Sequence, residues 1–162
     1  MRLTWNKLDA QCRRWRHNQQ TIAFTNGCFD LLHFGHVDYL TKSAMLADRL
    51  VIGLNSDASV RRIKGNHRPI QDEKSRSRVI SALGCVDAVV LFDDDTPDQL
   101  IRMISPDVLV KGGDYTLESI VGASYVMSQG GRVGIIPLAP GYSTTAIEKR
   151  ILRLADPQEG AG

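Results

Sequence analysis

Long apolar runs are missing from this sequence. Charged and polar side chains interrupt the first twenty residues throughout, and no later segment approaches the roughly 18 consecutive apolar residues that a membrane-spanning helix needs. The N-terminus therefore has the features of neither a signal peptide nor a membrane anchor. We expect a cytoplasmic protein with no membrane partner.

Cysteine and net charge are both low. The three cysteines, Cys12, Cys28 and Cys85, are widely spaced and odd in number, which suits a reducing compartment and provides no disulfide framework. The formal net charge is only +2, and this weak positive excess does not argue for a nucleic-acid partner. The charge balance is compatible with small phosphorylated substrates.

Repeats and low-complexity linkers are also lacking, and what the chain contains is an alternation of apolar runs and amphipathic stretches. The apolar runs predict strands over 21–25, 50–54, 88–92, 107–110 and 132–136. The other stretches predict helices over 4–17, 36–47, 72–83 and 119–129, with more beginning near 56, 97 and 143. Apolar strands separated by helices are typical of a parallel sheet that is covered on both faces.

We therefore predict one α/β domain over residues 1–155. Its fold is expected to be a Rossmann-like, doubly wound parallel sheet of about five strands with helices on both faces. Residues 1–20 are expected to form an N-terminal helical extension, and residues 156–162 a frayed tail.

The most informative motif, TNGCFDLLHFGHVDYL, spans residues 25–40 and follows the first predicted strand. Ligands of open α/β sheets bind beyond the carboxyl ends of the strands, and Gly27 allows a phosphate to approach the backbone closely there. His33 and His36 flank Gly35 where the next helix should begin, and a helix start presents unpaired N–H groups to anions. Two imidazoles at this place can hydrogen-bond phosphate oxygens and stabilise charge that develops on an α-phosphate.

Simpler explanations of these residues remain open. The histidines can be a satisfied surface pair, Gly27 a plain turn residue, Cys28 inert packing and Asp30 a local cap. A zinc site is disfavoured because no Cys or His cluster supplies the remaining ligands, so we predict no metal held by the protein. A nicotinamide-dependent oxidoreductase is disfavoured because no Gly-x-Gly-x-x-Gly follows the first strand.

Further polar residues follow the other predicted strands. The second predicted strand is followed by Asp57, then by Arg61 and Arg62, and then by Lys64. This basic segment can neutralise a leaving pyrophosphate, or it can be a solvated helix face. Arg76 carries a guanidinium that suits bidentate phosphate binding, although most charges on such a helix are merely exposed.

Two glycine-containing segments complete the set. Residues 111–115 (KGGDY) follow the fourth strand, where we favour a contact with the nucleotide or the acceptor over an ordinary turn. Residues 141–145 (GYSTT) precede the last helix. Ser143 suits the N-cap of that helix, and the hydroxyl and N–H groups there can also bind phosphate.

The run from Gly27 to His36, GCFDLLHFGH, resembles the signature of the cytidylyltransferase-like nucleotidyltransferases, the HxGH group. The resemblance implies that His33, His36 and Lys64 are catalytic and act on the triphosphate. It places three further residues at the acceptor substrate: Asp30, Asp57 and Arg76. The other residues that it places at the nucleotide are Asn26, Gly27, Cys28, Phe29, Gly35, Lys111, Gly112, Asp114, Gly141, Tyr142, Ser143, Thr144 and Thr145.

The similarity extends from about Thr21 to Ile151 and is strongest with the branch of the family that adenylylates D-glycero-D-manno-heptose 1-phosphate. It implies ATP and a sugar phosphate as substrates, with Mg²⁺ carried by the nucleotide phosphates. AMP would be transferred in line, pyrophosphate released, and ADP-heptose formed for the lipopolysaccharide core. That activity is often fused to a sugar kinase, and with 162 residues the chain resembles the stand-alone form.

One departure from the family pattern affects the choice of nucleotide. The glycerol-phosphate cytidylyltransferase branch has an arginine three residues before the position of Gly141, where this chain has Leu138. This weakens the case for CTP, although a cytidylyltransferase acting on a small alcohol phosphate such as glycerol 3-phosphate remains an alternative. A non-catalytic nucleotide-binding regulatory module is the alternative from another class. We expect a homodimer, the commonest soluble assembly.

Overall fold

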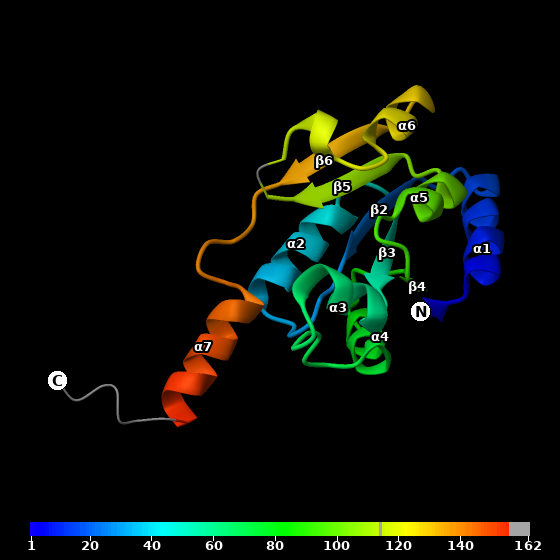
Figure 1. Ribbon diagram of the computed structural model, residues 1–162. Coiled ribbons are helices and arrows are strands. Elements are labelled where there is room, and N and C mark those ends of the chain that lie inside the picture. Colours follow the sequence, from blue (N-terminus) through cyan, green and yellow to red (C-terminus); the bar gives the residue numbers. More distant parts are fainter. Residues whose placement is uncertain (114, 156–162) are drawn as a thin grey trace.

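Six parallel strands form one sheet in the computed structural model, which describes residues 1–113 and 115–155 (Figure 1). The strand order is β1-β4-β3-β2-β5-β6. The strands are β1 (Arg2–Leu3), β2 (Ile22–Gly27), β3 (Arg49–Asn55), β4 (Ala88–Phe92), β5 (Val108–Gly112) and β6 (Arg132–Ile136). The predicted α/β class and parallel sheet are confirmed, with one strand more than expected. That strand, β1, pairs with β4 and has two residues, too few to show a pattern in the sequence.

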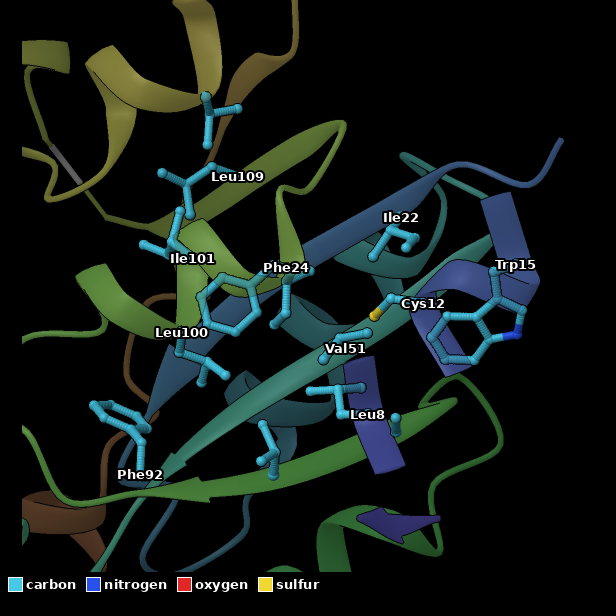
Figure 2. Packing of buried hydrophobic residues seen from close by; sticks show 14 of the residues in the cluster. Leu8, Cys12, Trp15, Ile22, Phe24, Val51, Phe92, Leu100, Ile101 and Leu109 are labelled. Carbon is cyan, nitrogen blue, oxygen red and sulfur yellow. The ribbon is translucent and has the colours of Figure 1, made fainter. Parts of the chain in front are cut away.

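Helices cover both faces of the sheet. Alternate residues of a strand point to opposite sides, and the buried strands place apolar residues on both sides. In β2, Ile22 and Phe24 pack with α1, α5 and α6, as Figure 2 shows in part. Ala23, which lies between them, packs with α2 and α4 on the other face. The helices are α1 (Trp5–His17), α2 (Phe34–Ala44), α3 (Asp57–Lys64), α4 (Glu73–Ser81), α5 (Asp98–Ile104), α6 (Ala123–Ser128) and α7 (Thr144–Ala155), with a 3-10 helix over Leu117–Ser119.

Residues 1–20, predicted as a helical extension, contribute both β1 and α1 to the layers. The side chains of Leu8, Cys12 and Trp15 on α1 are buried in the core cluster shown in Figure 2. The tail predicted to be frayed, 156–162, lies outside the described residues.

Two helices differ from their predicted bounds. α2 begins at Phe34 rather than at residue 36, so that the second histidine of the motif lies in its first turn. The segment predicted as one helix over 119–129 contains only α6, preceded by the short 3-10 helix. Gly122 separates the two with a φ of +84°, a left-handed conformation that favours glycine and interrupts a right-handed helix.

The order in which successive strands are added to the sheet reverses between β2 and β5, although all the strands run parallel. From β2 the sheet continues to β3 and β4 on one side and to β5 and β6 on the other. The crevice at such a reversal point is where doubly wound sheets bind ligands. Asn26 of β2 and Lys111 of β5 meet there, joined by a hydrogen bond of 2.5 Å from Lys111 Nζ to Asn26 Oδ1.

The last helix, α7, extends away from the sheet layers (Figure 1). None of its described residues is buried, and the side chains of Ile151, Leu152 and Leu154 are exposed. Within the described part of the chain, no helix has both the length and the apolar character needed to span a bilayer.

Candidate active site

The two histidines of the motif stack on each other at the start of α2. His33 occupies the N-cap position and His36 the first turn, with their ring centroids 3.8 Å apart and their planes inclined by 22°. Both Nδ1 atoms are buried, and among the described residues neither has a hydrogen-bond partner. Buried polar atoms normally have partners, so these two nitrogens are exceptions, and a ligand would reach the pair through the neighbouring pocket that both histidines line.

Burial keeps the two imidazoles neutral near neutral pH. Burial lowers the pKa of His33. It also lowers the pKa of His36 to about 4, with a further contribution from the neighbouring His33. A neutral imidazole can donate one hydrogen bond to a phosphate oxygen, and an approaching anion favours its protonation.

Glycine and phenylalanine of the motif fit closely around this stack. The ring of Phe29, a buried residue whose φ is +43°, meets the His36 ring at a centroid distance of 5.3 Å. A Cβ atom at Gly27 would lie 3.0 Å from the Phe29 ring, and one at Gly35 would lie 3.1 Å from both the His33 ring and Tyr142 Cβ. Side chains at these two glycine positions would therefore crowd the stack.

A pocket of about 240 Å³ opens beside the histidines. It joins residues that the sequence analysis predicted from three separate segments, together with Tyr39, Leu138 and Ala139, which it did not assign to the site. Ser143 Oγ accepts a hydrogen bond of 3.0 Å from the N–H of Ala146, which confirms the predicted N-cap. The predicted residues in the lining are His33, Gly35, His36, Lys64, Tyr142, Ser143, Thr144 and Thr145.

A second pocket of about 230 Å³ adjoins the first. The two share Lys64, Thr144 and Thr145. The second is also lined by the predicted Asp30 and by three residues that sequence reasoning missed, His67, Arg68 and Glu148. His67 and Arg68 could have been noticed because they follow Lys64 closely in the sequence, whereas nothing in the sequence singles out Glu148.

The carboxylate of Asp30 holds the loop that follows α3. Its oxygens accept hydrogen bonds of 2.9 Å from the N–H groups of Ile70 and Gln71 and one of 3.2 Å from Arg68 Nη1. Burial acts to raise the pKa of this carboxyl, but these hydrogen bonds and the Arg68 charge outweigh it and lower the pKa. Asp30 is thus an ionised anchor for the wall of the second pocket.

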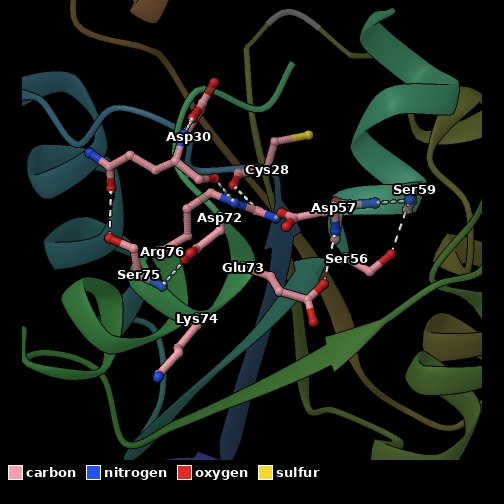
Figure 3. A network of polar contacts seen from close by, with 12 residues as sticks. Cys28, Asp30, Ser56, Asp57, Ser59, Asp72, Glu73, Lys74, Ser75 and Arg76 are labelled. Atoms are coloured by element: carbon pink, nitrogen blue, oxygen red, sulfur yellow. Dashed lines mark hydrogen bonds and ion pairs between the residues drawn. The ribbon is translucent and has the colours of Figure 1, made fainter. Parts of the chain in front are cut away.

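Arg76 and Asp57, both predicted at the acceptor, contact each other rather than either pocket (Figure 3). The Arg76 side chain is fully buried. Its Nη2 donates to Asp57 Oδ1 at 2.7 Å, its Nη1 to the carbonyl of Cys28 at 2.7 Å and its Nε to the carbonyl of Gln71 at 3.0 Å. Neither Arg76 nor Asp57 is among the described residues that line the two pockets. The guanidinium here ties the motif loop to α3 and to the chain before α4.

The predicted residues of β5 lie at the back of the site. Burial lowers the pKa of Lys111, whose ammonium group bonds Asn26. A Cβ atom at Gly112 would come within 2.7 Å of Leu138 and 2.9 Å of Tyr39, so both side chains pack closely on this glycine. The predicted residue Asp114 lies outside the described part of the chain.

Cys28 and Gly141 complete the predicted positions. Burial raises the pKa of the Cys28 thiol, which keeps it protonated and unreactive. Gly141 turns the chain into α7 with a φ of +82°. Within the described residues, no group of three or more His, Cys, Asp or Glu side chains is placed to hold a metal ion.

Fold and site together define a Rossmann-like α/β domain with a polar pocket between the starts of α2 and α7. The profile of the cytidylyltransferase-like family matches residues 24–150, and the chain belongs to that family. The predicted family and the enzyme class, a nucleotidyltransferase, are thereby confirmed.

The relatives compared include both curated proteins and solved structures. The bifunctional protein HldE of Syntrophotalea carbinolica is 58% identical over 137 residues, which are 85% of this chain and 28% of that protein. The bifunctional protein HldE of Nitrobacter hamburgensis is 55% identical over 143 residues, 88% of this chain and 29% of that protein. The chain thus spans less than a third of the length of these relatives.

A solved lipopolysaccharide core biosynthesis protein from Thermoplasma volcanium is 32% identical with a TM-score of 0.59, and the alignment covers 74% of this chain and 97% of that one. A pantothenate synthetase from Thermus thermophilus also has a TM-score of 0.59, over 92% of this chain and 70% of that one. At 14% identity, it shows the shared fold alone.

Proposed function

We propose that this chain is an adenylyltransferase that transfers AMP from ATP to a sugar 1-phosphate in the cytoplasm. The observation that carries the proposal is the pair of adjoining pockets, one beside the stacked histidines and one beside Arg68, which share Lys64 and the start of α7. Two substrates that react through their phosphates need two such neighbouring sites. The resemblance of the motifs to the heptose-adenylylating branch supports D-glycero-D-manno-heptose 1-phosphate as the acceptor and ADP-heptose as the product. The similarity to a lipopolysaccharide core biosynthesis protein supports a role for that product in the lipopolysaccharide core.

The reaction requires no covalent enzyme intermediate. An anionic oxygen of the acceptor phosphate forms a bond to the ATP α-phosphorus, the bond from that phosphorus to the bridging oxygen breaks, and the electron pair leaves with pyrophosphate. Catalysis then consists of positioning and charge stabilisation. His33, His36, Lys64 and the free N–H groups at the start of α7 would bind the triphosphate and stabilise the charge that develops on it.

Mg²⁺ is proposed to arrive on the nucleotide rather than to reside in the protein. The described residues offer no cluster of three ligands for a resident ion. Magnesium in nucleotide sites commonly takes its ligands from substrate phosphates and water.

Pyrophosphate release tests the substrates. The purified protein is incubated with ATP or CTP, each with heptose 1-phosphate or glycerol 3-phosphate. We expect turnover with ATP and heptose 1-phosphate. Turnover with CTP alone would establish the cytidylyltransferase alternative, and full turnover by His36→Ala would show that the chemistry lies elsewhere. Tight ATP binding without pyrophosphate release from any pair would indicate the regulatory module.

The homodimer is also a proposal, and the exposed face of α7 supports it. Ile147, Ile151 and Leu154 recur at helical spacing on a helix that buries none of its described residues. A second copy is the partner that is always present at matching concentration. Light scattering should give twice the chain mass, and Ile151→Asp should reduce it to that of one chain.

A further inference from the structure

Arg68 has its guanidinium enclosed between two carboxylates of different elements. Its side chain is only 7% exposed. Nη1 lies 3.2 Å from Asp30 Oδ2 in the loop between β2 and α2, and Nη2 bonds Glu148 Oε2 on α7. A buried guanidinium needs anionic or polar partners, because removing it from water is costly.

The two carboxylates differ in how firmly they are held. Asp30 is 4% exposed and also accepts hydrogen bonds from two backbone N–H groups, so it is fixed. The Glu148 side chain is 34% exposed and belongs to a helix that buries none of its described residues. Glu148 is therefore the partner that another anion can replace.

The surroundings of this pair favour a phosphate. Lys64 and Arg68 line the pocket with positive charge, against Asp30 and Glu148, and His67 is beside them. If the Glu148 carboxylate moves away, the pocket has an excess of positive charge, and Nη2 of Arg68 is free to bind another anion. Two oxygens of a phosphate monoester match a guanidinium, and the third would remain free to attack.

This position also adjoins the pocket in which the triphosphate is proposed to bind. Lys64, Thr144 and Thr145 line both pockets, so an anion on Arg68 would lie next to a triphosphate bound beside the histidines. A carboxylate that occupies this place from within the chain must compete with the acceptor.

We propose that Arg68 is the subsite for the phosphate of the sugar phosphate acceptor, and that Glu148 occupies this subsite until the acceptor displaces it. This inference rests on the proposed function. It implies that the part of α7 from Glu148 onward is released from the sheet layers when the acceptor binds, while the start of the helix stays at the pockets.

Steady-state kinetics with ATP and heptose 1-phosphate test the competition. Glu148→Gln keeps the size of the side chain and removes the competing charge, so KM for the acceptor should fall about threefold, the range of a partly exposed ion pair, while KM for ATP stays constant. Arg68→Lys should raise KM for the acceptor at least about tenfold, because the bidentate contact is lost. The matched control is Asp38→Asn, which removes the carboxylate of a surface ion pair on α2 and should change neither constant. An unchanged or increased acceptor KM in Glu148→Gln overturns the inference.

Hydrogen–deuterium exchange provides a readout other than activity. Inorganic phosphate, added without nucleotide, should speed exchange in residues 148–155 of the wild type. In Glu148→Gln the same segment should exchange fast without phosphate, and in Arg68→Lys phosphate should have no effect. No change in the wild type, or slower exchange, overturns the inference. If the wild type turns over none of the nucleotide and sugar phosphate pairs but shows this phosphate effect, the proposed function fails while the anion subsite stands.

Discussion

The stacked histidines give the site a pH dependence that can be measured in the unfolding equilibrium. The pKa of His36 is lowered from 6.5 to about 4 in the folded protein. Between these values the unfolded chain binds the proton and the folded chain does not, so the free energy of unfolding decreases as the pH falls through this window.

We predict that His36→Asn flattens this dependence, because the variant lacks the imidazole with the strongly lowered pKa. Urea unfolding of both proteins at roughly pH 7 and pH 4.5 measures the two changes. The wild type should lose more stability on acidification than the variant. Equal losses would mean that His36 is not shielded from water.

Arg76 is the residue at which sequence and structure assign different contacts. From the sequence, Arg76 is expected at the acceptor because its guanidinium suits phosphate, whereas in the structure it pairs with Asp57 and two backbone carbonyls. Charge type alone cannot distinguish these outcomes, since the partners come from segments up to 48 positions away. The place of both histidines at the start of α2 could be predicted because their motif is local, but the stacking of their rings could not. The Arg68–Glu148 pair could not be predicted because it joins positions 80 residues apart.

We predict that Arg76→Met destabilises the protein by about 3–5 kcal/mol, the loss expected when one partner of a buried ion pair is removed. Arg78→Met, on an exposed position of the same helix, is the control and should change stability little. Urea unfolding measures both. A stable Arg76→Met protein with a greatly increased KM for the acceptor would instead support the phosphate contact.

At the scale of elements, the bounds of the helices depend on the backbone conformation of single residues. Gly122 divides the segment predicted as one helix, and the pattern of apolar residues gives no sign of its positive φ. The start of α2 is functionally more important, because it brings Gly35 and both histidines into one turn.

We predict that Gly35→Ala separates binding from stability. Alanine favours a helix over glycine by about 1 kcal/mol, but its Cβ would press on the His33 ring and on Tyr142 at 3.1 Å. KM for ATP should rise about tenfold, equivalent to about 1.4 kcal/mol of binding, while the free energy of unfolding stays close to that of the wild type. Gly84→Ala, where a Cβ would meet nothing within 4 Å, is the control. Unchanged kinetics in Gly35→Ala would show that the stack adjusts.

For the molecule as a whole, the sheet is a layer between two apolar clusters, and α1 packs against one of them. Sequence periodicity located the helix and its buried side, but could not show that these residues pack against α5 and the strands rather than forming a separate extension. Leu8 and Cys12 are fully buried in that cluster, and β1 covers the edge of β4.

We therefore predict that residues 1–20 are needed for folding. Removing them would expose the apolar face formed by β2, β3 and α5, and the shortened chain should lose cooperative unfolding. A milder form of the same test is Leu8→Ala, which should cost about 2–5 kcal/mol because a buried leucine leaves a cavity. Met45→Ala, at a side chain that is 80% exposed, should cost little. If the shortened chain unfolds cooperatively and releases pyrophosphate at the wild-type rate, α1 is an accessory helix and the domain is complete from about residue 21 onward.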